Sequence, residues 1–306
     1  EHIFHNGNFC GIFQYSQKGI QRLAMQLKPT CFDDIAALGA IYRPGPLASG
    51  MDELYVRGKH DPSSVTYDHP ILEEILGNSY GCMVYQEQVL AIANRLGKLT
   101  LGEAEKLRKL ISKKQKGDGL KELENFKVKF VAGCAENDYD EKRATDLWDM
   151  MAKFAGYGFN RAHAASYGMN TYHTAWLATY YPLEFYAAVL TKAEAGEKQE
   201  YVDELIKLKI KVLPISVNNS KDDTIIEDGG IRLAFDLVKG VGNSVVGKIV
   251  AGQPYTSVHD FMQRSGATKT AIMPLAKIGA FDCVENNQRR VQAFLDMFYE
   301  NSTKHK

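Results

Sequence analysis

The chain has 306 residues, of which 45% are hydrophobic and 24% are charged, and its formal net charge at pH 7 is zero. The length allows two domains or three, and the composition is ordinary for a soluble globular protein. Zero net charge excludes an overall field that would attract nucleic acid or a membrane, so any polyanion site must come from local charge. No apolar run approaches the roughly 20 residues that span a bilayer. The five scattered cysteines form no Cys-x-x-Cys pair, which favours a reducing, cytoplasmic setting.

Helix-period apolar spacing predicts a mainly helical chain from residue 1 to residue 190. The predicted helices are 20–27, 84–96, 103–115, 120–134, 141–154 and 172–190. A rigid proline-glycine loop is expected at Arg43–Pro46, and polar turn material is expected over 57–70.

The character of the sequence changes near residue 191. A charged linker leads to a predicted helix at 199–209, and strand-like runs follow at 211–217 and 224–235. Asp228-Gly229-Gly230, inside the second run, indicates a hairpin. The chain is expected to be helical again after residue 236. We therefore expect a mainly α fold in three parts: a helical domain over 1–190, a small mixed α/β segment over 191–235 and a helix-hairpin-helix module over 236–306.

The densest group of functional side chains lies in residues 154–167. Two glycines flank Tyr157, so the backbone there can bend and expose the ring. The side chains that follow are Asn160, Arg161, His163 and Ser166. Aromatic, cationic and hydrogen-bonding groups together suit a site for a base, a sugar and a phosphate. A glycine-rich turn before an ordinary packed helix is the alternative, because short motifs often match by chance.

A basic helix is predicted before this segment. Thr100 and Glu103 have the spacing of a capping box, which predicts a helix start. Arg108 lies beside the apolar stripe and is expected to be half-buried and oriented. A separate stripe of positive charge is formed by Lys106, Lys109, Lys113 and Lys116. A polyphosphate or a nucleic-acid backbone would bind such a stripe, whereas a solvated charged face is the alternative.

A Gly-x-Gly turn is predicted between two helices near residue 240. Gly240 and Gly242 are separated by Val241, and Lys239 precedes them. Backbone amides exposed at a helix start bind phosphate without sequence preference. This is the pattern of a helix-hairpin-helix, and a plain turn between helices is the alternative.

Short motifs follow one another in order from about residue 8 to residue 290. They include Gly11–Gln14, Tyr42–Leu47, Tyr80–Gln88, Leu101–Arg108, Phe154–Asn160, Tyr181–Phe185, Lys239–Gly242 and Gly279–Asp282. No single motif is unique, but the ordered set resembles the C-terminal part of the C-family bacterial replicative DNA polymerases, the polymerase III alpha subunits.

The resemblance implies that residues like 1–190 form the fingers domain of the polymerase, and that a small mixed segment and a helix-hairpin-helix module follow. It implies binding of the incoming nucleotide by Arg108, Lys109, Lys113, Tyr157, Asn160, Arg161 and His163. It implies DNA contacts by Arg43, Lys106, Lys116, Lys239, Gly240, Val241 and Gly242. Lys109 stands where the family usually has arginine, so a point charge replaces a two-pronged donor. Such departures favour a divergent member, bacterial or viral.

The catalytic aspartates of the family lie upstream of the motif matched by Gly11–Gln14, and this chain carries no match to them. Asp138-Tyr139-Asp140 falls in a predicted interhelical loop rather than a strand. Two-metal phosphoryl transfer needs carboxylates that hold two ions about 4 Å apart. The resemblance therefore implies a nucleotidyltransferase whose Mg²⁺ is bound by a palm supplied elsewhere, with no catalytic residue or metal ligand in this chain. The isolated chain, an excised part or one product of a split gene, is expected to be inactive.

The expected partners are primer–template DNA, a deoxynucleoside triphosphate and a polymerase portion that carries the palm and thumb. The alternative is a non-enzymatic protein, derived from a polymerase fragment, that binds DNA or the replisome. Phe294–Phe298 also resembles a sliding-clamp-binding peptide. It lacks the leading glutamine, and Val291, Phe294, Leu295 and Phe298 fit a packed helix better.

Overall fold

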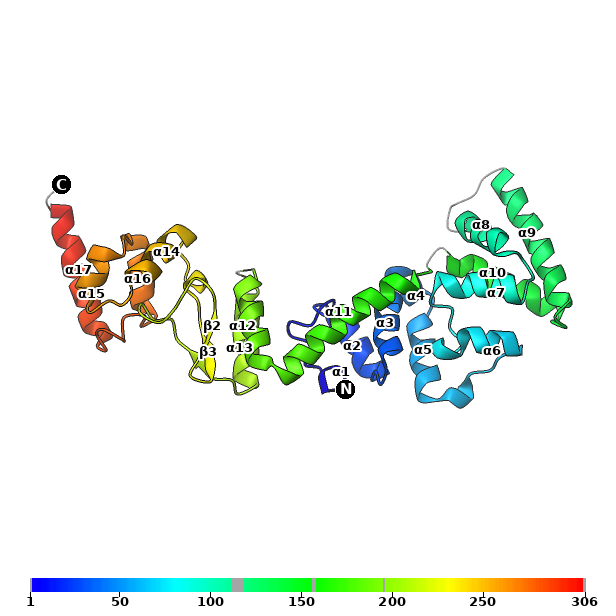
Figure 1. Ribbon diagram of the computed structural model, residues 1–306, viewed down its shortest axis with the longest axis horizontal. Coiled ribbons are helices and arrows are strands. Elements are labelled where there is room, and N and C mark those ends of the chain that lie inside the picture. The colour runs from blue at the N-terminus through cyan, green and yellow to red at the C-terminus, as the bar shows by residue number, and fades with distance from the viewer. Residues whose placement is uncertain (1, 112–117, 156–157, 195, 305–306) are drawn as a thin grey trace. The chain divides into compact units, whose positions relative to one another are not determined.

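The computed structural model describes residues 2–111, 118–155, 158–194 and 196–304 (Figure 1). It is mainly α-helical with one small sheet, as predicted. The chain forms two compact units: an N-terminal unit, Glu1–Ala175, and a C-terminal unit, Trp176–Lys306. The boundaries expected at residues 190 and 235 stay predictions.

The N-terminal unit is built of helices. They are α1 (His2–Asn6), α2 (Lys18–Leu27), α3 (Phe32–Ile41), α4 (Pro44–Ala48), α5 (Met51–His60), α6 (Pro70–Leu76), α7 (Gln86–Arg95), α8 (Leu101–Ile111), α9 (Asp118–Ala135), α10 (Glu141–Ala155) and the first part of α11 (Arg161–Tyr180). A cluster of buried side chains joins α7, α8, α9 and α10, and the ring centroids of Phe130 and Trp148 in it lie 5.5 Å apart.

Local signals placed several of these helices correctly. The amide of Glu103 donates to Thr100 Oγ1 at 3.2 Å and the amide of Thr100 donates to Glu103 Oε2 at 2.9 Å, which confirms the capping box before α8. Asp138–Asp140 lies between α9 and α10, as expected. Residues 112–115, the end of the predicted basic helix, lie outside the described residues.

Prolines account for two wrong predictions. Arg43–Pro46 is the start of helix α4 rather than a loop, because a proline at the first helical position has no N–H to satisfy and a φ that suits the helix. The single helix predicted at 172–190 is two helices. α11 ends at Tyr180 and α12 begins at Pro182, where the ring prevents the helix from continuing. The polar stretch 57–70 also begins inside α5.

The C-terminal unit contains helices and one three-stranded sheet. Beyond α11 the elements are α12 (Pro182–Lys192), α13 (Lys198–Lys207), β1 (Val212–Leu213), β2 (Ile225–Glu227), β3 (Gly230–Arg232), α14 (Asn243–Gly252), α15 (Val258–Arg264), α16 (Lys269–Lys277) and α17 (Gln288–Lys304). The strand order is β1-β3-β2, with β3 parallel to β1 and antiparallel to β2.

The β2–β3 hairpin is confirmed. Its two turn residues, Asp228 and Gly229, have φ values of 50° and 70°. Such a pair suits a tight two-residue turn whose twist matches the strands. The register sets Ile226 opposite Ile231, and Ile231 is fully buried. The strands are shorter than the runs predicted from the sequence.

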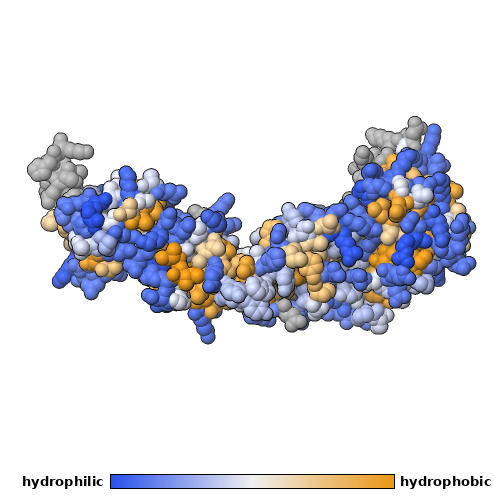
Figure 2. Space-filling model, in the orientation of Figure 1, coloured by the Kyte–Doolittle hydropathy of each residue, from blue (hydrophilic) through white to orange (hydrophobic). Residues whose placement is uncertain are grey.

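Helices α14 to α17 share one core, in which Phe261 meets Phe281 edge to face at 5.0 Å. An α-helix was predicted before the Gly240 turn, and that prediction was wrong. The segment there is a short 3₁₀ helix, Phe235–Leu237. On the face in Figure 2, hydrophilic residues predominate over both units and hydrophobic residues form separate areas. No helix in the described ranges is long and apolar enough to cross a membrane.

Replacing Gly240 by alanine should destabilise the C-terminal unit. Gly240 has a φ of 98°, and a Cβ there would lie 2.7 Å from the carbonyl oxygen of Thr270. We expect a loss of about 1–3 kcal/mol in the free energy of unfolding, measured by urea denaturation. Gly247 in α14 is the matched control, because a Cβ there meets open space. Gly247→Ala should stabilise the unit by about 0.5–1 kcal/mol, and equal effects at both positions would contradict the prediction.

Candidate functional site

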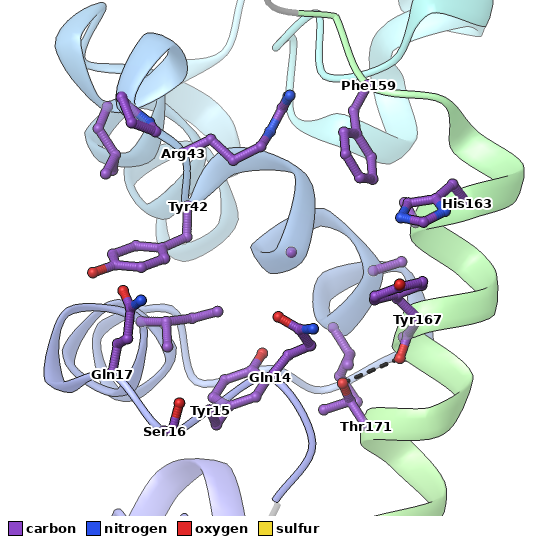
Figure 3. Close-up of a pocket in the computed structure, with 18 residues that line it drawn as sticks. Gln14, Tyr15, Ser16, Gln17, Tyr42, Arg43, Phe159, His163, Tyr167 and Thr171 are labelled. Carbon is purple, nitrogen blue, oxygen red and sulfur yellow. Dashed lines mark hydrogen bonds between the residues drawn. The ribbon is translucent and has the colours of Figure 1, made fainter.

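A cavity of about 560 Å³ lies in the N-terminal unit and is lined by α11, α3, the start of α4 and the segment Gln14–Gln17 (Figure 3). We call it the α11 cavity. Its lining includes aromatic, amide and cationic side chains: Gln14, Tyr15, Gln17, Tyr42, Arg43, Phe159, His163 and Tyr167. Such a lining offers flat faces for a ring and hydrogen-bonding groups around it.

Three rings follow one another from the loop before α11 onto the helix (Figure 3). The ring centroids of Phe159 and His163 are 5.2 Å apart, and those of His163 and Tyr167 are 4.1 Å apart. His163 and Tyr167 lie one helical turn apart, so their side chains emerge on the same face. Thr171, another turn along, donates to the carbonyl oxygen of Tyr167 at 3.2 Å. One side of the α11 cavity is therefore a row of three rings, in which Phe159 and His163 meet edge to face and the His163 and Tyr167 rings are tilted by 37°.

Arg43 lies across from this row of rings. Its guanidinium carbon is 4.4 Å from the centre of the Phe159 ring, and its Nε donates to the Ala40 carbonyl at 2.7 Å. Partial burial lowers the pKa of Arg43, but an arginine side chain stays charged at neutral pH. The cavity thus has a fixed cation against an aromatic wall.

The start of α11 is tied to the first turn of α7. Asn160 caps α11, with its Oδ1 accepting from the His163 amide at 2.8 Å. The Glu87 carboxylate accepts from the amide of Arg161 and from the side-chain amide of Asn160, each at 3.0 Å. A carboxylate already occupies this helix start, where positive partial charge favours an anion. Phosphate would have to displace Glu87 to bind there.

Arg161 and His163, two residues apart, line different cavities. His163 lines the α11 cavity. Arg161 lines a smaller one of about 250 Å³ together with Asp33 and Glu87, and its guanidinium lies 5.7 Å from the centre of the Tyr85 ring. The residues predicted from the 154–167 segment therefore do not all converge on one site. Tyr157, the predicted stacking ring, lies outside the described residues.

Arg108 is partly buried and held in one orientation, as its place beside the apolar stripe predicted. Its Nε and Nη2 donate to the two oxygens of Glu105 at 2.9 and 2.7 Å, and its Nη1 donates to Gln86 Oε1 at 3.0 Å. The hydrogen bonds from Arg108 lower the pKa of Glu105 to about 2, and the same pairing raises the pKa of Arg108. Both groups are charged throughout the physiological range.

The described part of the basic stripe is interspersed with acids. Lys106 pairs with Glu122, and Lys109 lies 3.4 Å from Glu105. These carboxylates offset part of the positive surplus that the sequence suggested. Lys113 and Lys116 lie outside the described residues.

Sequence reasoning missed several residues of the site. Phe159 and Tyr167 lie four residues on either side of His163, so helical spacing could have indicated a shared wall. Tyr42 and Gln14 carry no such signal, because folding alone brings them to the cavity.

The Gly-x-Gly turn forms a second candidate site, in the C-terminal unit. Gly242 caps α14, and the first amides of a helix, here at Asn243 and Ser244, have no intrahelical acceptor. Val241 is buried in the core and anchors the turn, whereas Lys239 is exposed beside it. This geometry suits contact with a phosphate. Throughout the described ranges, no group of three or more histidine, cysteine, aspartate or glutamate side chains could hold a metal ion.

Comparisons with known proteins cover nearly the whole chain. Residues 2–138 match the family described as bacterial DNA polymerase III alpha subunit finger domain, and residues 209–291 match a helix-hairpin-helix motif family. DNA polymerase III subunit alpha of Chlamydia trachomatis is 41% identical over 99% of this chain and 25% of its own length. The Campylobacter jejuni protein is 38% identical over 90% of this chain and 24% of its own length. The Pseudomonas aeruginosa protein is 36% identical over 92% of this chain and 25% of its own length.

The chain thus carries a match to a polymerase finger domain followed by a match to a helix-hairpin-helix. The chain belongs to the family of bacterial DNA polymerase III alpha subunits, as its ordered motifs predicted. It spans about a quarter of the length of the curated relatives it matches.

Proposed function

We propose that this chain is the fingers and helix-hairpin-helix part of a DNA-directed DNA polymerase. In that role it binds the incoming deoxynucleoside triphosphate and grips the primer–template duplex during template-directed synthesis. The observation that carries the proposal is the α11 cavity, which combines ring faces with Arg43 in a chain of this polymerase family.

The cavity suits a base and its sugar. Phe159, His163 and Tyr167 offer faces on which a base stacks, and stacking tolerates any base because every base has a π face. Arg43 attracts the negative charge of the nucleotide. Arg108 is joined through Gln86 to Gly158, the residue before Phe159. Arg108 neutralises the triphosphate, and Lys109 lies beside it.

The other predicted nucleotide ligands have less direct support. Asn160 shapes the start of α11 through its cap, and Arg161 faces the smaller cavity. The roles of Lys113 and Tyr157 stay predictions. The Mg²⁺ that the complete polymerase uses belongs to the palm-bearing portion, which is the expected protein partner.

Duplex DNA is gripped by the second site. The Gly240–Gly242 turn and Lys239 contact a phosphate of the backbone, which gives affinity without sequence preference. Lys106, Lys116 and Arg43 stay proposed DNA contacts, and Lys106 would exchange its partner Glu122 for a phosphate. Replication of DNA by this polymerase fits the cytoplasmic setting expected from the cysteines. Clamp binding through Phe294–Phe298 has little support, because α17 buries Val291 and Leu295 in the core.

Tyr167 and Tyr172 provide a matched test of nucleotide binding. Both are exposed tyrosines of α11, by 41% and 45%, but only Tyr167 lines the α11 cavity. Tyr167→Ala should weaken binding of a deoxynucleoside triphosphate about 10-fold, as expected for the loss of one base-stacking ring. The affinity is measured by fluorescence titration of the chain with primer–template present. Tyr172→Ala should change the affinity less than about twofold, on the scale of an ordinary surface substitution.

Equal effects of the two variants, or no nucleotide binding by the wild-type chain, would contradict the proposal. The isolated chain should show no primer extension with or without Mg²⁺. Robust extension by a pure sample would overturn the assignment of the chemistry to another portion. Binding of DNA alone, without nucleotide, would favour the non-enzymatic alternative.

A further inference from the structure

We infer that Gln86, the first residue of α7, is a positioning residue. It sets the Arg108 guanidinium, the proposed triphosphate ligand, relative to Phe159, the first ring of the α11 cavity. The inference rests on the proposed function. It concerns the α11 cavity and Arg108, and Gln86 itself does not line that cavity.

The side-chain amide of Gln86 uses both of its ends. Its Oε1 accepts from Arg108 Nη1 at 3.0 Å, and its Nε2 donates to the carbonyl oxygen of Gly158 at 3.0 Å. Its backbone amide also donates to the carbonyl oxygen of Phe159 at 2.9 Å. One residue thus holds an arginine of α8 and two successive residues of the loop before α11. That loop carries Phe159, the first ring of the wall.

The loop fits closely over the Gln86 side chain. A Cβ at Gly158 would lie 2.9 Å from Gln86 Cγ and 3.1 Å from the Phe154 ring. Only a glycine therefore lets the chain lie this close to Gln86. The contact is a built feature of the loop rather than a chance approach of two surface groups.

Arg108 is oriented by Gln86 and Glu105 together. These bonds use three of its five N–H donors, and the other two make no bond within the described ranges. Those two donors remain for an anion. Because Gln86 is neutral, it fixes the guanidinium plane without adding a second carboxylate that would compete with a triphosphate.

Only an amide side chain serves both neighbours. Methionine has a similar length but neither a strong acceptor nor a donor. Glutamate keeps an acceptor for Arg108 but has no donor for the Gly158 carbonyl, which its charge would repel. The two replacements therefore separate the two contacts of Gln86.

A double-mutant cycle on the 306-residue chain tests the inference. Dissociation constants for a deoxynucleoside triphosphate, here dATP, are measured with primer–template present for the wild type, Gln86→Met, Arg108→Ala and the double variant. Gln86→Met should weaken dATP binding about 10-fold in the wild-type background but less than about twofold in the Arg108→Ala background, since the two residues act as a unit. Affinity for primer–template should stay within about twofold throughout, as for groups that do not touch the duplex.

The exposed Gln26 of α2 supplies the control, and Gln26→Met should leave every constant unchanged. Gln86→Glu should give an intermediate loss and serves in place of Gln86→Met if that variant fails to fold. The NMR signal of the Arg108 Nε–H should shift in Gln86→Met and not in Gln26→Met, independently of any ligand.

The positioning role would be overturned if Gln86→Met weakened dATP binding by the same factor in the wild-type and Arg108→Ala backgrounds. It would also be overturned if the NMR signal of the Arg108 Nε–H did not shift in Gln86→Met. Either result counts even if the wild-type chain binds dATP. A wild-type chain that binds no dATP would instead overturn the proposed function, and the positioning role with it.

Discussion

Replacing Asp34 by asparagine is expected to lower the free energy of unfolding of the N-terminal unit by about 3–5 kcal/mol, because it breaks a buried ion pair and leaves a buried cation uncompensated. Asp34 is 0% exposed. Its Oδ2 accepts from Lys59 Nζ at 2.6 Å and from the Thr30 amide at 3.0 Å, and its Oδ1 accepts from the Tyr80 hydroxyl at 3.3 Å. The Lys59 side chain is only 9% exposed. Urea denaturation followed by circular dichroism measures the loss.

The adjacent carboxylate is the matched control. Asp33 also lies in the first turn of α3 but is exposed, so Asp33→Asn should change the stability by less than about 0.5 kcal/mol. Similar losses for Asp33→Asn and Asp34→Asn would show that a general helix-start charge, rather than the buried pair, supplies the stability.

The same carboxylate gives a pH dependence with a definite sign. Burial alone would raise the pKa of Asp34, but the hydrogen bonds from Lys59 and Thr30 outweigh it and lower the pKa below the ordinary value of 3.8. The stabilisation is therefore complete above that value and is lost as the pH falls below it. Asp34→Asn should remove this part of the acid unfolding, and an unchanged acid profile would contradict the assignment.

Replacing Arg108 by alanine should raise the KM for nucleotide about 10- to 100-fold in a polymerase that contains this chain together with its palm, because hydrogen bonds to charged groups contribute about 1.5–3 kcal/mol. The side chain is only 25% exposed and is oriented by Glu105 and Gln86. The Arg108 side chain therefore loses little conformational freedom when a triphosphate binds. The KM for primer–template should rise less than about threefold, since this role concerns the nucleotide. Steady-state kinetics with each substrate varied in turn give both constants.

Lys109 is the control on the same turn of α8. Its side chain is 65% exposed and 3.4 Å from the same Glu105, so Lys109→Ala should raise the nucleotide KM only about two- to threefold. A nucleotide KM unchanged in Arg108→Ala, or a larger effect of Lys109→Ala, would remove Arg108 from the proposed triphosphate site.

Signals that act over a few residues were read correctly from the sequence. The Thr100–Glu103 capping box and the Asp228-Gly229 turn each depend on bonds or dihedral angles within four residues, so the sequence carries them completely. The predictions were wrong at two prolines: Pro44 was expected to lie in a loop, and Pro182 was expected to lie within a helix. Each of them starts a helix, because a proline is compatible with a first turn but not with an interior one.

By itself, the sequence determined the family, because the order of the motifs along the chain needs no knowledge of their positions in space. It also determined that aromatic, cationic and hydrogen-bonding side chains are concentrated in residues 154–167. Only the tertiary structure decided that His163 faces the α11 cavity and Arg161 a different one, and that Gln86 joins Arg108 to the loop at Gly158. The physical reason is sequence separation: Gln86 and Gly158 are 72 positions apart, and no local spacing rule reaches that far.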